Sequence, residues 1–308
     1  MIKEIIDKLV ALLAVSALLA SCSESELWQN PQTEARDGYI MLNFKTEIPA
    51  MQEVVTRAVD PDGGGVQDMT LFCFDSYGLF ISTVKAGVTV QKPGPGEMEG
   101  TFKAEVPENT RTIHFLANQN MDEFKEDSFR NKSESEVMAV LEGSSGRMIY
   151  WGRFACDAGN DSNIAEQMAT SGNSVKLIRN HARISVDNPD NNGHIVITGF
   201  AVCNTNAFGT VAPHHPKKGF DFTWPSSDDP FVTLPVNDAK MSDITDVTSS
   251  MNQYVFECEN SADAPVSVIL RGHLPDQDEE KYYRVLLVDD KGEQLLVRRN
   301  HHYKLHIE

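Results

Sequence analysis

The sequence has no long hydrophobic run after its first two dozen residues, and it has few basic residues. A multipass membrane protein needs several stretches of about 20 apolar residues, so that class is excluded. Among 308 residues, 45 are acidic and 27 are basic, which gives a net charge of −18. Nucleic acid is therefore an unfavourable partner, because binding to phosphate backbones depends on Lys and Arg. The composition, 41% hydrophobic and 23% charged, is otherwise that of a folded protein.

Motifs for catalysis and for metal binding are also missing. The chain has no GxSxG, HExxH or P-loop sequence. His302 and His306 share a strand face, but a rise of about 3.3 Å per residue places them ~13 Å apart, too far to ligate one ion. Asp60, Asp62 and Asp68 lack the D-x-D-x-D-G order of a calcium loop. We therefore expect no enzyme activity, no cofactor and no metal site.

The five cysteines are scattered, at positions 22, 73, 156, 203 and 258. No pair has CxxC spacing, which excludes a zinc ribbon or a thioredoxin-type site. Cys73, Cys203 and Cys258 lie in apolar, strand-like runs, where a buried cysteine acts as a small hydrophobe. Free core thiols are the expectation, although export from the cell would also permit disulfides.

The N-terminus has the features of a signal peptide. Lys3 and Lys8 flank a short polar start, and an apolar run over residues 9–20 follows it. This run is too short to span a bilayer of ~30 Å as a helix. It ends in Leu19-Ala20-Ser21-Cys22, which resembles the bacterial lipoprotein box. That resemblance implies removal of residues 1–21, acylation of Cys22 and attachment to the outer membrane. The acidic stretch Ser23-Glu24-Ser25-Glu26 resembles a surface-display signal of Bacteroidetes lipoproteins. The alternative is an ordinary signal peptide with a nearby cysteine.

Alternation of apolar residues predicts a chain made mainly of strands. Residues 22–37 are polar and are expected to form a tether, after which Ile40, Leu42 and Phe44 point to one face of a half-buried strand. The glycine run at 63–65 predicts an exposed loop, and Ser133 with Glu136 has the spacing of a capping box for one helix near 133–141. Further strands are expected at 69–75, 79–83, 101–106, 112–116 and 148–154.

A second set of strands follows residues 171–173. Strands are expected at 175–186, 195–202, 254–257, 266–270, 283–288, 294–298 and 303–307. The sequence Asp289-Asp290-Lys291-Gly292 predicts a hairpin turn, since glycine adopts the positive φ that such turns require. Many short strands without strand–helix alternation favour antiparallel sandwiches. We expect an all-β protein with two sandwich domains, at 38–173 and 174–308.

Several short motifs, in order, resemble the fimbrillin superfamily of Bacteroidales type V pili. They are the lipobox, the first strand at 39–46, the sequence Thr56-Arg57-Ala58, and the strand LFCFDSYG at 71–78. Later matching pieces are TIHFLAN at 112–118, MIYWG at 148–152, VKLIR at 175–179 with ARI at 182–184, and RNHHY at 299–303. Each motif alone is too short to be specific. The resemblance rests on their order over nearly the whole chain.

This resemblance implies two transthyretin-like sandwiches and a surface pilus component that acts in cell adhesion. In stalk subunits of that family, an arginine-specific protease cuts behind the first strand, here between Arg57 and Ala58. Loss of the strand with Ile40, Leu42 and Phe44 would then open a groove for another subunit's strand, by β-augmentation. Partners would be other fimbrial subunits, the outer membrane through Cys22, and a host or bacterial surface ligand. The alternatives are that Arg57 is only a solvated loop charge, and that the protein is an anchor that keeps its first strand.

A tip or minor subunit is the expected position in a pilus. The alternation of Tyr303, Leu305 and Ile307 runs to the penultimate residue of this chain, so no spare strand follows as a donor. Two other functions remain open at this point: a surface glycan-binding lipoprotein and a hydrolase on a sandwich scaffold. Of the tryptophans that could stack on sugars, Trp151 is expected in the core.

Overall fold

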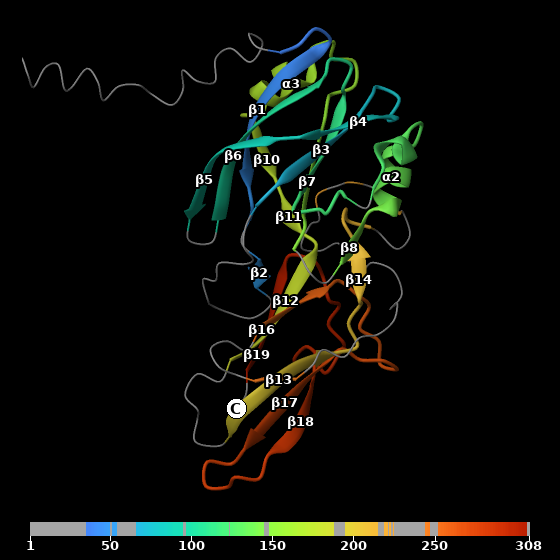
Figure 1. The fold of residues 1–308 in the computed structure, drawn as a ribbon. Coiled ribbons are helices and arrows are strands. Elements are labelled where there is room, and N and C mark those ends of the chain that lie inside the picture. The colour runs from blue at the N-terminus through green and yellow to red at the C-terminus, as the bar shows by residue number, and fades with distance from the viewer. Residues whose placement is uncertain are drawn as a thin grey trace, which may run out of the picture.

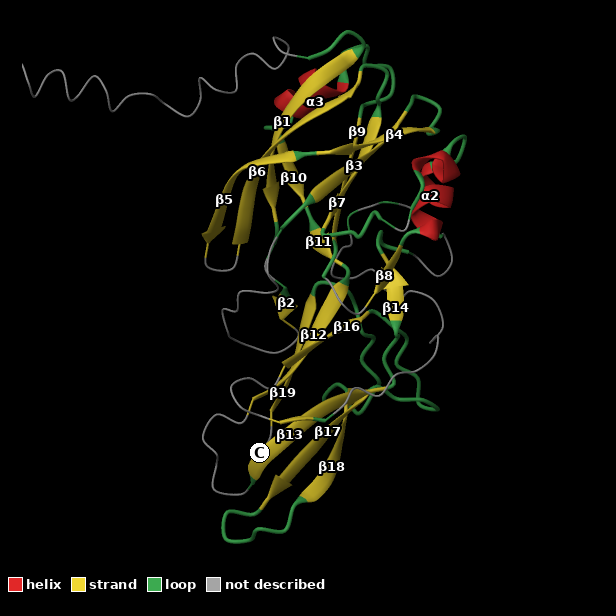
Figure 2. Ribbon diagram, in the orientation of Figure 1, coloured by secondary structure: helices red, strands yellow, loops and turns green. Residues whose placement is uncertain are grey.

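Strands account for most of the regular structure, which confirms the all-β class (Figures 1 and 2). The computed structural model describes residues 35–49, 51–53, 66–94, 97–122, 124–144, 148–187, 195–214, 219–220, 222, 224, 244–246 and 252–306. No helix in these ranges is long and apolar enough to cross a membrane.

The first sandwich consists of a four-stranded and a five-stranded sheet. The four-stranded sheet has the order β10 (Ser174–Lys176), β1 (Tyr39–Glu47), β6 (Glu97–Pro107), β5 (Gly87–Gly94). The other has the order β11 (Ile178–Arg179), β9 (Tyr150–Ala155), β7 (Thr112–Ala117), β3 (Met69–Phe74), β4 (Phe80–Lys85). Every residue of β3 and β7 is buried. These two fully buried strands therefore form the centre of a sheet that is covered on both faces.

The second sandwich also has two principal sheets, each with four strands. One has the order β16 (Asn252–Phe256), β12 (His181–Asp187), β19 (His301–His306), β2 (Gln52–Glu53). The other has the order β15 (Thr245–Asp246), β13 (Val196–Cys203), β17 (Ser267–His273), β18 (Lys281–Leu286). Side chains such as Ile184, Phe200, Leu270 and Tyr303 fill the space between them. The strand β2 comes from the N-terminal part of the chain and is the only one of these strands that precedes β12.

Helices cap the first sandwich. Helix α2 (Glu134–Val140) begins with the expected capping box between Ser133 and Glu136. The sequence predicted one helix, and this was incomplete, because α3 (Ile164–Thr170) and a 3-10 turn, η2 (Glu126–Phe129), are also present. Asn163 and Glu166 form the capping box of α3, and the helix buries Ile164 and Met168 against β1. The signal for α3 was therefore present in the sequence, in the same spacing as in α2.

The two sandwiches lie end to end and share backbone pairing (Figure 1). Strand β8 (Glu142–Ser144), which follows α2, pairs with β14 (Phe208–Thr210) of the second half. Val211 and Ala212 then pack into the apolar cluster on the outer face of the first sandwich's five-stranded sheet, beside Phe72 and Leu116. The chain therefore returns from the second sandwich to complete the packing of the first.

The predicted single strand at 175–186 is divided into three. Strand β10 pairs with β1, β11 pairs with β9, and β12 belongs to the second sandwich. The chain changes sheets at Leu177, which is buried between them, and again at Asn180. The expected start of the second domain at residue 174 thus precedes two short strands that pair with the first sandwich.

Most strand pairs are antiparallel, as expected, but β1 with β10, β12 with β19, and β19 with β2 are parallel. Each parallel pair joins segments that are far apart in the sequence, and parallel pairing requires such long connections. The alternation within one strand does not show which distant strand lies beside it.

The hairpin turn predicted at 289–292 is present. The side-chain carboxylate of Asp289 accepts hydrogen bonds from the backbone N–H groups of Lys291 (2.8 Å) and Glu293 (2.9 Å), and Gly292 has φ of +82°. The strand expected after it, at 294–298, is reduced to isolated bridges of Gln294 and Val297.

The four cysteines in the described ranges are free thiols, and Cys73, Cys203 and Cys258 are buried as predicted. Burial raises the pKa of Cys73 and of Cys258 to about 12. These thiols are therefore protonated at neutral pH and act as small hydrophobic groups.

A candidate strand-exchange site

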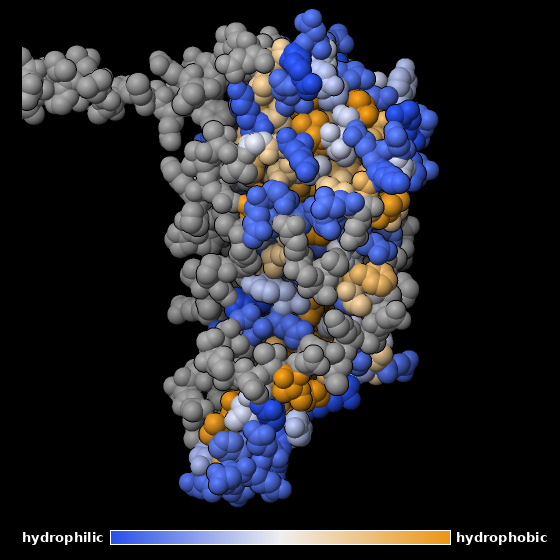
Figure 3. Space-filling view, viewed as in Figure 1, coloured by the Kyte–Doolittle hydropathy of each residue, from blue (hydrophilic) through white to orange (hydrophobic). Residues whose placement is uncertain are grey.

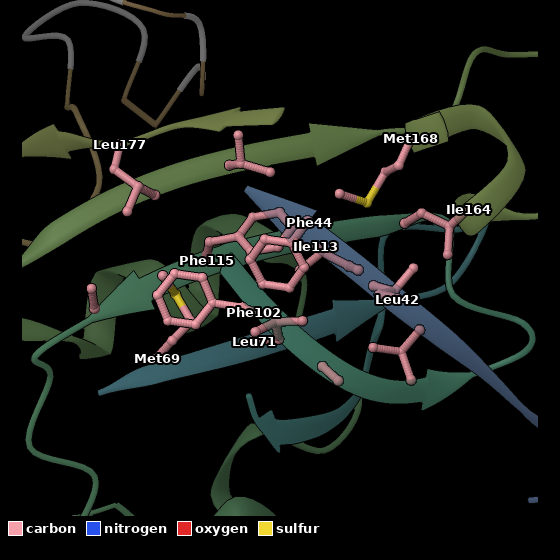
Figure 4. Packing of buried hydrophobic residues seen from close by; sticks show 14 of the residues in the cluster. Leu42, Phe44, Met69, Leu71, Phe102, Ile113, Phe115, Ile164, Met168 and Leu177 are labelled. Carbon is pink, nitrogen blue, oxygen red and sulfur yellow. The ribbon is translucent and has the colours of Figure 1, made fainter. Parts of the chain in front are cut away.

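Strand β1 occupies the inside of a sheet, between β6 and β10, rather than an edge. Ile40, Leu42 and Phe44 all point into the core, and their side chains are 6%, 1% and 0% exposed. Figure 4 shows Leu42 and Phe44 among side chains of the opposite sheet and of α3. The structure therefore confirms that the three residues share one buried face, while their exchange for another strand stays a prediction.

Phe44 makes the closest aromatic contacts of the strand. Its ring centroid lies 5.5 Å from that of Phe102 on β6, in a stacked arrangement, and 5.0 Å from that of Phe115 on β7, in an edge-to-face arrangement. Phe102 and Phe115 are themselves fully buried. Phe44 thus contacts its own sheet and the facing sheet together.

The buried face continues past Phe44, through the end of β1 and beyond it. Thr46 and Ile48 are fully buried and Met51 is 7% exposed. The sequence argument stopped at Phe44, although the period of two reaches Ile48 directly. Pro49 follows Ile48 and breaks the alternation of apolar residues, so the sequence pattern does not extend the buried face to Met51.

Hydrogen bonding on the two sides of β1 is unequal. On one side β6 pairs with β1 from Tyr39 to Thr46. On the other side β10 pairs only with the last three residues, Lys45 to Glu47, and the Ser174 hydroxyl donates to a carboxylate oxygen of Glu47 at 2.6 Å. If β1 left this position, a groove would remain between β6, which pairs with β1 over eight residues, and β10, which pairs in parallel with only three.

The chain after β1 is attached to the second sandwich. Strand β2 adds to the edge of β19, with Gln52 opposite His301. A terminal nitrogen (Nη1) of the Arg179 guanidinium donates to the carbonyl of Pro49 at 2.6 Å and to the side-chain oxygen of Asn300 at 2.8 Å. We call residues 39–49 and 51–53 the N-terminal arm. This arm contacts both sandwiches, which the sequence did not predict.

Cys22, Arg57 and Ala58 lie outside the described residues. Their predicted roles in lipidation and processing therefore remain predictions. In chain order, Arg57 follows β2 and precedes β3, so a cut between Arg57 and Ala58 would separate the whole N-terminal arm from the rest of the chain.

A buried ion pair closes the junction beside the arm. The Arg299 guanidinium donates to both carboxylate oxygens of Glu257, at 2.8 and 3.0 Å, and both side chains are 1% exposed. Arg299 also donates to the carbonyls of Val211 and Thr210. Burial, and then the nearby positive charge of Arg299, lowers the pKa of His181 to about 3.

A second polar cluster lies at the N-terminus of α2. The Trp151 indole donates to Nδ1 of His114 at 3.0 Å, and Nε2 of His114 lies 2.7 Å from Glu134. Arg153 makes two further hydrogen bonds to Glu134. Although burial opposes it, hydrogen bonds from His114 and Arg153 lower the pKa of Glu134 to about 2.

This cluster is unsuited to catalysis. His114 is fully buried and both of its ring nitrogens are engaged within the protein, whereas a general base must reach a proton on the substrate. Within the described residues, no group of three or more His, Cys, Asp or Glu side chains could hold a metal ion. The hydrolase alternative thus gains no support from this cluster.

Among the described residues, the exposed aromatic side chains belong to separate parts of the chain. The exposed aromatics are Tyr39, Tyr77, Trp224 and Tyr282, on separate elements or loops, and Trp151 is buried as expected. Figure 3 shows mainly hydrophilic residues on the face in view, with scattered apolar ones. An aromatic platform for stacking on sugars is not found among the described residues.

The fold and the arm define a class: an all-β protein of two sandwiches, whose first strand is inserted between two others. No protein-family model and no curated protein matches this sequence. Among solved structures, the chain is similar to the tip fimbrial protein Mfa3 from Porphyromonas gingivalis, with TM-score 0.51, 14% identity, and 86% of this chain and 94% of that chain covered. This likeness shows a shared fold.

Two other solved structures resemble the chain more weakly. A proposed cell adhesion protein from Bacteroides eggerthii has a TM-score of 0.42 and 13% identity, with 83% of each chain covered. The fimbrial anchor protein Mfa2 from Porphyromonas gingivalis has a TM-score of 0.28 and 14% identity, with 79% of this chain and 82% of that chain covered.

Proposed function

We propose that this chain is a non-catalytic fimbrial subunit of the fimbrillin superfamily, displayed on the outer membrane and active in cell adhesion. It assembles by β-strand exchange at the position of β1. The observation that carries the proposal is the insertion of β1 between β6 and β10 with Ile40, Leu42 and Phe44 in the core. The fold shared with a tip fimbrial protein agrees with it.

The energetics of β1 suit exchange better than simple release. Each fully buried large apolar side chain stabilises the fold by ~1.5–3 kcal/mol. The arm buries Ile40, Leu42, Phe44, Ile48 and Met51, so the total is on the order of 10 kcal/mol, comparable with the stability of a whole domain. An empty slot would also leave unpaired backbone groups. A cut arm is therefore expected to stay bound until another strand replaces it.

The tip is the favoured position in the fimbrium. Mfa3 is a tip fimbrial protein, and a tip subunit has to accept a strand from the subunit below. The alternative is an anchor, which keeps its arm and its lipid on Cys22 because processing at Arg57 would separate that lipid from the body.

An arginine-specific protease tests the proposal. Limited digestion of the folded, mature chain is expected to cut after Arg57 and produce a new N-terminus at Ala58, read by mass spectrometry. Mixing the cut protein with a peptide or stalk subunit that provides a donor strand should displace the arm, as measured by gel filtration. The variant Arg57→Lys is the matched control, because it keeps the charge and removes the cleavage site.

Cleavage at Arg36 provides an internal comparison. Arg36 lies before β1 and pairs with Glu105 on the surface, so a cut there removes the tether but leaves the arm. A protein that is cut only at Arg36 and never at Arg57 would favour the anchor. Failure of every donor strand to displace the arm of the Arg57-cut protein would overturn strand exchange.

A further inference from the structure

The segment of residues 174–179 contacts the arm where the arm leaves the first sandwich. Strand β10 pairs in parallel with the end of β1, and the Leu177 N–H donates to the carbonyl of Glu47 at 2.8 Å. Beyond Leu177 the segment changes sheets, and β11 places Arg179 opposite Tyr150 of β9. Within the described residues, the main-chain pairing between this segment and the arm therefore ends at Glu47.

The Arg179 side chain extends this contact to Pro49. Its Nη1 atom donates to the carbonyl of Pro49 at 2.6 Å, and the same nitrogen donates to the side-chain oxygen of Asn300 at 2.8 Å. Arg179 is only 2% exposed, and the central carbon of its guanidinium lies 5.8 Å from the centroid of the Tyr150 ring. A buried side-chain donor therefore binds the arm at a position beyond the described main-chain pairing.

This contact lies where the arm crosses between the sandwiches. Arg179 belongs to β11 of the first sandwich, whereas Asn300 directly precedes β19 of the second. Asn300 has φ of +56°, and its N–H donates to the carbonyl of His181 at 2.8 Å, so the second sandwich holds it in place. The pairing of β2 with β19 begins at the next residue, His301. Arg179 thus contacts the arm between its two strands and contacts the second sandwich at the same time.

The acceptor on the arm is a main-chain carbonyl, which every strand possesses whatever its sequence. Arginine is always charged, and hydrogen bonds from a charged donor are stronger than those between neutral groups. Burying a charge without acceptors is costly, so Arg179 is expected to favour an occupant that fills this position. A strand that stopped at the end of β1 would leave the guanidinium without the acceptor that Pro49 provides.

We propose that Arg179 recognises the main chain of the strand that occupies the arm's position, by binding the carbonyl at the crossing between the sandwiches. For a donor strand from another subunit, this inference rests on the proposed function, and it specifies what that partner requires. The donor has to continue in extended form past the end of β1 and present a carbonyl to Arg179. The type of side chain at that point of the donor is not what Arg179 recognises.

A two-chain form of the mature protein tests the contact. A site for a sequence-specific protease, placed between Arg57 and Ala58, produces the cut whether or not the native chain is processed there. The two-chain protein is unfolded in urea, separated from its own arm, and refolded with a fluorescently labelled synthetic arm of residues 38–53. Fluorescence anisotropy at a fixed, moderate urea concentration then measures the dissociation constant of the arm.

The synthetic arm is made in two forms, with an amide or an ester between Pro49 and Ala50. The ester carbonyl is a weaker acceptor, so we expect the ester arm to bind the wild type about fivefold more weakly. Arg179→Met should bind the amide arm about tenfold more weakly than the wild type does, and the difference between the two arms should largely disappear. Because the ester removes the Ala50 N–H in both proteins, the comparison between the proteins isolates the contact with Arg179.

Arg153→Met is the matched control. Arg153 is another partly buried arginine of the first sandwich, and it binds Glu134 rather than the arm, so this variant should keep the full penalty for the ester. Arg179→Gln is a second variant in case Arg179→Met does not fold, because its side chain is polar but too short to reach Pro49. An ester penalty of the same size in the wild type and in the Arg179 variants would overturn the proposal.

Failure of strand exchange would give a different result. Donor strands that displace the arm only when they extend to the position of Pro49 would support both proposals. If no donor strand displaces the arm while the ester penalty still depends on Arg179, strand exchange is overturned and recognition of the native arm stands. If donor strands that stop at the end of β1 displace the arm as well as longer ones do, the requirement placed on the partner is overturned.

Discussion

At the scale of single residues, Phe44 illustrates how one side chain of the arm stabilises the first sandwich. It is fully buried and packs on Phe102 and Phe115 from two different sheets. The neighbouring Lys45 belongs to the same strand and is exposed. Substitutions at these two residues therefore distinguish the loss of buried contacts from the effect that any substitution in β1 would have on stability.

Replacing Phe44 by Ala is expected to lower the free energy of unfolding by ~3–5 kcal/mol, since it removes a buried ring and leaves a cavity. Lys45→Ala should change it by less than about 0.5 kcal/mol. Urea titration followed by circular dichroism measures both. Equal effects of the two variants would show that the buried face is not what stabilises β1.

Glu257 is the second residue whose substitution should strongly destabilise the fold. Glu257→Gln leaves the fully buried Arg299 charge without its partner, which is expected to cost ~3–5 kcal/mol. The exposed pair of Arg130 and Asp127 supplies the comparison, because Asp127→Asn should cost no more than ~1 kcal/mol. The midpoint of chemical unfolding reports both, and a mild effect of Glu257→Gln would indicate that water reaches Arg299.

Histidine burial makes stability depend on pH. In the folded state the pKa of His181 is lowered from 6.5 to about 3, so the unfolded chain binds a proton that the folded chain does not. Stability is then fully present above pH 6.5 and is lost as pH falls toward 3, by up to about 1.4 kcal/mol per pH unit. The pKa of the buried His114 is also lowered, which acts in the same direction.

Unfolding in urea at pH 7.5 and pH 5 checks this expectation. The wild type should lose stability at pH 5, and His181→Gln should lose less of it over the same interval. A variant with the same pH dependence as the wild type would assign the effect to other groups.

At the scale of elements, the N-terminal arm behaves as one unit because β1 and β2 follow each other without a cleavable arginine between them. One strand lies inside the first sandwich and the other adds to the edge of the second. A replacement strand that occupies only the position of β1 would leave the backbone of β19 without its pairing to β2.

Cleavage at Arg57 should therefore not release the arm in buffer. The arm is expected to elute with the body in gel filtration, because its buried apolar side chains contribute on the order of 10 kcal/mol, and to separate only in denaturant. Ile48→Asp, which places a charge at a buried position, should allow separation after the same cut. Spontaneous loss of the wild-type arm would contradict the packing described for Ile48 and Met51.

The sequence was sufficient for those elements whose signal is local. The alternation of Ile40, Leu42 and Phe44, the capping box at Ser133, and the Asp289 turn all lie within a few residues and all were predicted correctly. The pairing of Gln52 with His301 and of Phe208 with Ser144 was not, because the partners are far apart in the chain. Arg299 and Glu257 show the same limit, since neither position alone indicates a buried charge pair.

At the scale of the whole molecule, the two sandwiches are joined by shared structure rather than by a linker. The β8–β14 pair, the arm, and Val211 and Ala212 in the first sandwich's cluster all cross the junction. Breaking one sandwich would remove contacts from the other.

We therefore expect one cooperative transition in calorimetry of the uncut chain, although it is long enough for two domains. Val211→Asp, which places a charge in the shared cluster, should split the transition or broaden it. Two separate transitions in the wild type would show that the junction contributes little to stability.

The direction of β1 has a mechanical consequence. Backbone hydrogen bonds of an antiparallel pair lie perpendicular to the strands, and β1 pairs with β6 from Tyr39 to Thr46. A pull applied to the chain at Tyr39, at the N-terminal end of β1, runs along the strand and across these bonds. The load is then shared by the whole ladder in shear, instead of opening the bonds one after another. If the chain is anchored through the residues before β1, as proposed, the uncut protein would thus resist a pull most strongly along the axis of β1.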